Sequence, residues 1–94
     1  MKAELLLREV WRLDEQAAVE IVIWRLPKPL AGSPHGFKYR LAYIERGRCV
    51  LRYDNEAGKG DHRHVGRREE AYHFSDPESL QVDFWRDVDE WRRK

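Results

Sequence analysis

The most constraining feature of this sequence is the alternation of apolar and polar residues in three runs, at 3–13, 37–44 and 49–53. Successive side chains of a β-strand point to opposite faces of a sheet, so alternation predicts strands with one buried face, with a helix as the alternative for the first run. Two further runs are predicted to be strands because they contain β-branched or aromatic residues. In chain order the five runs span residues 3–13, 17–26, 37–44, 49–53 and 70–74.

The third and fourth runs predict a hairpin that closes near Gly47. With a loop of odd length, Leu41 would face Tyr53 and Arg40 would face Asp54, which places the aromatic residues of both strands on one side. Between the second and third runs, "PKPLAGSPHG" contains three of the four prolines. Proline lacks the amide proton of a sheet ladder, so this stretch is predicted to be a loop.

The period changes after residue 75. Leu80, Phe84, Val88 and Trp91 follow one another at spacings of four, four and three, which is typical of an amphipathic helix. "SDPE" precedes it and offers either a capping box from its Ser and Glu or an Asp cap followed by Pro. The predicted fold class is therefore α+β. We expect an antiparallel sheet of about five strands with the C-terminal helix packed on one face, in a single domain over residues 1–94.

Composition excludes several classes of protein. The longest apolar runs are four residues, as in "IVIW", far short of the ~20 that a membrane span needs. Charged residues interrupt the N-terminal apolar stretch, so no signal peptide is expected. The single cysteine, Cys49, cannot form an internal disulfide, and its apolar neighbours predict a buried thiol. These features favour a cytoplasmic protein.

The formal net charge of +1 conceals an uneven distribution. Residues 35–68 contain nine Lys or Arg and four Asp or Glu, whereas residues 69–91 contain eight acids and one base. Either the basic part binds phosphates, or the two parts neutralise each other in the folded protein. Charge alone does not choose between these two interpretations.

The segment "GKGDHRH" between the fourth and fifth runs contains two of the four histidines. In an extended chain His62 and His64 project to the same side, while Arg63 points away. Two imidazoles on one side have three explanations: a metal site, acid–base catalysis, or ordinary hydrogen bonding in a polar loop. A metal site would need further ligands, for which the candidates are His35, Asp54 and Asp61.

Several neighbours suit an anionic substrate. The glycines around Lys59 allow backbone amides to approach an anion, although the full phosphate-loop pattern is missing. Asp54 either orients an imidazole, pairs with Arg40 or forms a turn. The cationic side chains either lie on a solvated strand face or hold a phosphate beside the histidines. They are Lys38, Arg40, Arg52, Lys59 and Arg63.

Residues 37–84 resemble the TumE-type family of small bacterial proteins, regarded as toxins of toxin–antitoxin modules. The resemblance is carried by "KYRL" at 38–41, "YDNE" at 53–56 and "GKGDHRH" at 58–64, and it extends more weakly through "IVIWRLP". It implies a two-gene module whose second product is an antitoxin, expected to be a helix-turn-helix DNA-binding protein. It implies no assignment of catalytic residues.

Many toxins of this size act on RNA, so we expect an endoribonuclease that needs no metal and no cofactor. Its chemistry requires a base, an acid and cations around the phosphate. The alternatives are a non-catalytic module that binds nucleic acid or a partner, and a metal-dependent enzyme. The candidate catalytic residues are His62, His64 and Asp54, and the candidate RNA-binding residues are Lys38, Arg40, Arg52, Lys59 and Arg63.

Overall fold

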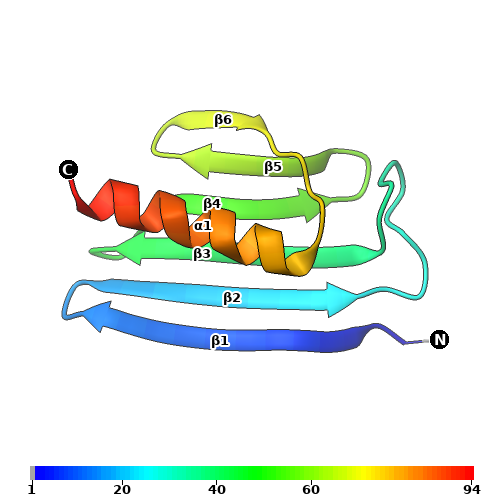
Figure 1. Ribbon diagram of the computed structural model, residues 1–94, viewed down its shortest axis with the longest axis horizontal. Helices are drawn as coiled ribbons and strands as arrows, with labels where there is room; N and C mark the ends of the chain where they lie inside the picture. Colours follow the sequence, from blue (N-terminus) through cyan, green and yellow to red (C-terminus); the bar gives the residue numbers. More distant parts are fainter. Residues whose placement is uncertain (1) are drawn as a thin grey trace.

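The computed structural model describes residues 2–94 as one antiparallel sheet and one helix (Figure 1). Each strand pairs with the next in the chain, so the spatial order is β1-β2-β3-β4-β5-β6. The predicted α+β class is confirmed, but the strands number six rather than five. The elements are β1 (Glu4–Asp14), β2 (Ala17–Arg25), β3 (Phe37–Glu45), β4 (Arg48–Glu56), β5 (Gly60–Val65), β6 (Arg68–Ala71) and α1 (Pro77–Arg92).

The additional strand is the histidine segment itself. Gly58 and Gly60 adopt φ values of 79° and 78°, which only glycine takes without strain, and they turn the chain from β4 into β5. β5 contains polar residues on both faces, so hydrophobic alternation gave no signal for it. The predicted fifth strand at 70–74 corresponds to β6, which begins at Arg68 and ends at Ala71.

The predicted pairing of β3 with β4 is confirmed. Leu41 lies opposite Tyr53 and Arg40 lies opposite Asp54. The turn, however, has two residues, Arg46 and Gly47, rather than an odd number. Both have positive φ, 53° and 77°, as in the turns that match the twist of a hairpin.

A register shift restores the predicted pairing. Tyr43 pairs with Leu51 while Ile44 pairs with Cys49, so Val50 is the extra residue of a β-bulge. The bulge breaks the alternation between Cys49 and Leu51. Cys49 is therefore exposed, and the prediction that its thiol is buried was wrong.

Helix α1 lies over β3 and β4 and buries its apolar stripe against them (Figure 1). Leu80, Phe84 and Val88 are no more than 1% exposed. Of the two predicted helix starts, the structure uses the aspartate: the backbone N–H of Ser79 donates to Oδ1 of Asp76 at 2.7 Å. No helix among residues 2–94 is long and apolar enough to cross a membrane.

The opposite side of the sheet has no helix over it. We call this side the open face, and β-pairing places Trp24, Arg40, Arg52, His62 and His64 on it. Alternate residues of β2, β3 and β4 point toward α1 and form the core. The open face is thus rich in charged and histidine side chains, whereas the helix side is rich in aromatic ones.

Three tyrosines on the helix side of the sheet donate hydrogen bonds to aspartate side chains. Burial raises the pKa of Tyr39, Tyr53 and Tyr72 above the ordinary tyrosine value, and a hydrogen bond to an aspartate raises it further in each case. Each phenol donates its proton, to Asp61 at 2.6 Å, to Asp87, and to Asp83 at 2.5 Å, respectively. The phenols therefore stay protonated in the folded protein.

We expect the free energy of unfolding to fall steeply as the pH rises above about 10, the ordinary pKa of tyrosine. The unfolded chain loses phenolic protons there, whereas the raised pKa values keep them on the folded protein. Urea unfolding followed by circular dichroism from pH 8 to pH 11 measures the effect, and Tyr72→Phe should make the pH dependence shallower. A free energy that stays constant to pH 11 would contradict this account.

Candidate active site

The predicted histidine pair lines a small hollow on the open face, where β4, β5 and β6 lie side by side. The hollow has a volume of about 180 Å³. His62 and His64 project into it from β5, as the alternation predicted, while the other strands supply charged groups. The residues lining it are Arg52, Asp54, Glu56, Lys59, His62, His64 and Glu69.

His64 is held by a cation on one side of its ring. Nη2 of Arg52 donates to Nε2 of His64 at 3.1 Å. A guanidinium has only donors, so this nitrogen is the acceptor and the ring proton lies on Nδ1. Nε of Arg52 also lies 3.1 Å from Oδ2 of Asp54, and Oδ1 of Asp54 is 4.0 Å from Nε2 of His64. Arg52 therefore stands between Asp54 and His64.

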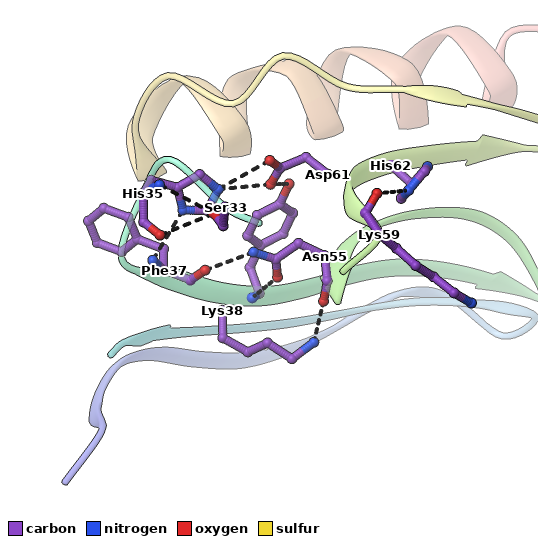
Figure 2. A network of polar contacts seen from close by, with 9 residues as sticks. Ser33, His35, Phe37, Lys38, Asn55, Lys59, Asp61 and His62 are labelled. Atoms are coloured by element: carbon purple, nitrogen blue, oxygen red, sulfur yellow. Dashed lines mark hydrogen bonds and ion pairs between the residues drawn. The ribbon is translucent and has the colours of Figure 1, made fainter. Parts of the chain in front are cut away.

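His62 has the opposite tautomer. Its Nε2 lies 2.6 Å from the carbonyl oxygen of Lys59, as Figure 2 shows. A carbonyl oxygen only accepts, so Nε2 carries the proton and, in the neutral ring, Nδ1 has the free lone pair. The two imidazoles thus differ in which nitrogen can receive a proton and which can donate one.

Glu69 connects the two rings from β6. Its Oε1 lies 3.6 Å from Nδ1 of His62, and its Oε2 lies 3.5 Å from Nδ1 of His64. The Glu69 side chain is 57% exposed, so an incoming ligand can displace it at low cost. Three carboxylates and two permanent cations line the hollow, which makes it less basic than the sequence suggested.

Of the other predicted cations, Lys59 lines the hollow, whereas Arg40 and Lys38 lie outside it. Lys59 is exposed and lies 3.5 Å from Glu56. Arg40 also lies on the open face. It is the β3 residue directly opposite Asp54 in β4, but its ion pair is with Glu20, at 3.6 Å from Nη1. Lys38 donates to the carbonyl oxygen of Asn55 (Figure 2).

The structure does not bring Arg63 into the hollow. Its guanidinium lies on the helix side of the sheet, where it pairs with Glu70 and with Asp87 of α1, the latter at 3.2 Å. These pairs join the basic and acidic parts of the sequence, as the neutralisation interpretation predicted. Arg63 therefore ties β5 to β6 and to the helix.

His35 and Asp61, weighed as further metal ligands, pair with each other instead. Nε2 of His35 lies 2.9 Å from Oδ1 of Asp61, and Nδ1 of His35 accepts the backbone N–H of Phe37 at 3.1 Å (Figure 2). The two side chains are 12% and 11% exposed, and the His35 ring packs on Phe74 with centroids 4.0 Å apart. This cluster fastens the loop before β3 to the end of the sheet, away from His62.

Asn55, in the motif "YDNE", completes this end of the sheet. It is 1% exposed; its Nδ2 donates to the carbonyl oxygen of Phe37 at 2.7 Å and its Oδ1 accepts the N–H of Tyr39 at 3.0 Å (Figure 2). The side-chain amide thus takes the place of a strand backbone and continues the ladder beyond the last β3–β4 pair. Part of the motif is therefore structural.

Sequence reasoning missed two residues of the hollow, Glu56 and Glu69. Glu69 lies opposite His64 across the β5–β6 pair, so only recognition of β5 as a strand could have revealed it. Alternation does place Glu56 on the same face as Asp54, at the end of β4, but Glu56 was not counted among the candidate site residues.

An open antiparallel sheet with one helix and a histidine-lined hollow defines a small α+β protein with a polar surface site. The family described as "Toxin TumE" matches residues 3–92, nearly the whole chain. The chain belongs to this toxin family, and the match extends on both sides of the 37–84 stretch that carried the resemblance. No curated protein and no solved structure matches it. Membership implies an antitoxin partner.

Proposed function

We propose that this toxin is an endoribonuclease that cleaves single-stranded RNA in the cytoplasm without a metal or cofactor, using His62 and His64 as the acid–base pair. The observation that carries the proposal is that the two imidazoles line one hollow and make different contacts, Nε2 of His62 with the carbonyl oxygen of Lys59 and Nε2 of His64 with Arg52. Phosphodiester cleavage needs one group that takes a proton and another that gives one. We also propose that residues 1–94 form a single domain.

In the proposed reaction, an RNA phosphate displaces Glu69 from the hollow. Nδ1 of His62 takes the proton of the 2′-hydroxyl, and the 2′-oxygen forms a bond to phosphorus. The bond from phosphorus to the 5′-oxygen breaks, and His64, which enters the reaction as an imidazolium, gives that oxygen a proton and becomes neutral while His62 becomes charged. The products are a 2′,3′-cyclic phosphate and a 5′-hydroxyl, so atoms and protons balance.

Arg52 couples substrate binding to the protonation of His64. In the free protein its Nη2 donates to Nε2 of His64, so that ring nitrogen is already occupied. When its guanidinium turns to a phosphate oxygen, Nε2 becomes free to accept a proton and faces the carboxylate of Asp54. Lys59 and Arg40 would contact neighbouring phosphates, and Lys38 would contribute charge further along the open face.

A second candidate function is binding of nucleic acid or a partner protein without cleavage. The carboxylates of the histidine hollow repel a phosphate and so disfavour cleavage there, whereas an apolar hollow elsewhere on the open face can hold a base or a partner side chain. That hollow is lined by Val22, Trp24, Lys38, Tyr39 and Arg40. A half-buried tryptophan beside two cations suits base stacking without chemistry.

Growth and RNA assays separate these functions. We expect expression without the antitoxin to arrest growth, and the purified protein to cut single-stranded RNA in EDTA, leaving 2′,3′-cyclic phosphate ends. Binding with a steep salt dependence but no cleavage would favour the second function. Activity lost in EDTA and restored by a divalent ion would favour the metal-dependent enzyme.

We also propose that the antitoxin is a helix-turn-helix protein, because the resemblance implies such a partner. The acidic α1 or the histidine hollow is a suitable region for it to cover. Co-expression with the adjacent gene should give a complex that survives gel filtration at low salt, and separate elution of the two proteins would contradict the pairing.

A further inference from the structure

The two edges of the sheet differ in how they are protected. β6 has four residues, and its charged side chains discourage the addition of another strand. β1 has eleven residues and carries four exposed large apolar side chains. They are Leu5, Leu6, Val10 and Trp11, of which Val10 is 72% and Trp11 49% exposed.

The centre of β1 is a regular strand. Residues Leu7–Arg12 pair with β2 without interruption, and register shifts occur only on either side of this stretch. Every second backbone N–H and C=O of Leu7–Arg12 points away from β2, toward the free edge. This stretch can therefore form a new ladder with an extended chain.

The side chains of this stretch define what such a chain must carry. Arg8, Val10 and Arg12 lie on the open face, whereas Glu9 and Trp11 lie on the helix side. Within residues 2–94, neither Arg8 nor Arg12 forms an ion pair, whereas six other arginines do. The edge thus presents two available cations on either side of an apolar side chain.

We propose that an extended segment of the antitoxin adds to β1 as a further strand. On its open-face side the segment would place acidic residues opposite Arg8 and Arg12 and an apolar residue opposite Val10. On the helix side it would place an apolar residue opposite Trp11 and a basic or polar residue opposite Glu9. Direct cross-strand neighbours of opposite charge stabilise an antiparallel pair, and like charges destabilise it.

A second copy of this chain is a poorer occupant of the edge. Twofold antiparallel pairing centred on Glu9 would set two Glu9 carboxylates opposite each other. Pairing centred on Val10 would set Arg8 opposite Arg12 of the other copy, twice. The two registers that use most of the regular stretch therefore both oppose like charges.

The test is a charge reversal at this edge with a matched reversal at the other. We expect R8E/R12E to weaken binding to the purified cognate antitoxin at least about 100-fold, because the acidic partner would face two carboxylates. The control R67E/R68E changes the same charges beside β6 and should bind as the original protein does. Calorimetry measures both, with circular dichroism verifying the fold. In cells, R8E/R12E should remain toxic despite the antitoxin.

Hydrogen–deuterium exchange tests the added ladder directly. Amides of Leu7–Arg12 that exchange freely in the free toxin should become protected in the complex, while those on the outer edge of β6 should not. Equal binding of R8E/R12E, unchanged exchange in β1, or a free toxin that dimerises through β1 would each overturn the proposal. None of these readouts depends on RNA cleavage, so failure here is distinguishable from failure of the proposed ribonuclease activity.

Discussion

Replacing either His62 or His64 with Gln should reduce RNA cleavage by about 10²- to 10⁴-fold, the range that general acid–base groups contribute, and should abolish growth arrest. Gln keeps a hydrogen-bonding side chain of similar reach but cannot carry a proton between the reacting oxygens. Both residues are partly exposed on the open face, so the fold should survive. Initial rates on a single-stranded RNA measure the effect.

The fourth histidine provides a matched control. His73 is exposed and lies outside the hollow, so His73→Gln should leave cleavage unchanged. The rate of the original protein should also fall on both the acidic and the alkaline side of an optimum, because one imidazole must be neutral and the other charged. Folded His62→Gln and His64→Gln proteins that arrest growth fully would show that the hollow is a binding or structural feature.

Replacing Asn55 with Ala should lower the free energy of unfolding by about 2–6 kcal/mol, because two buried backbone groups lose their partners at about 1–3 kcal/mol each. The groups left without a partner are the carbonyl oxygen of Phe37 and the N–H of Tyr39. Urea unfolding followed by tryptophan fluorescence measures the change. Glu56→Ala is the control for stability, because the Glu56 side chain is exposed and lies against Lys59 rather than against the backbone of β3.

A small effect of Asn55→Ala, within about 0.5 kcal/mol of the exposed control, would show that water replaces the amide. Asn55 would then not be needed to join β3 to β4. The motif residues "YDNE" would in that case have to be explained by function rather than by the architecture of the sheet.

Alternation and helical spacing predicted most of the sheet and all of the helix, because both depend on burial of apolar side chains. The pairing of Leu41 with Tyr53 and the stripe from Leu80 to Val88 are examples. β5 was missed because its inward side chain, Arg63, is neutralised by partners from β6 and α1 that no local pattern reveals.

The candidate site could be predicted only in part. Alternation predicted that His62 and His64 share one side and that Arg63 points to the other. The same alternation therefore argued against Arg63 as an RNA-binding residue beside the histidines, and in the structure Arg63 pairs with Asp87 of α1. The pairing of His35 with Asp61 joins residues 26 positions apart and depends on how the proline-rich loop folds back. Such long-range contacts leave no periodic trace in a sequence.

The position of α1 after all six strands affects how the toxin folds as it is made. Strands β1 to β6 can pair one after another as they leave the ribosome, before Leu80, Phe84 and Val88 have emerged. Until then Tyr53 lacks Phe84, whose ring packs edge-on against it with centroids 5.8 Å apart, and the nascent sheet exposes its aromatic side. A truncation that begins at Pro77 would therefore remove the helix and leave that side uncovered.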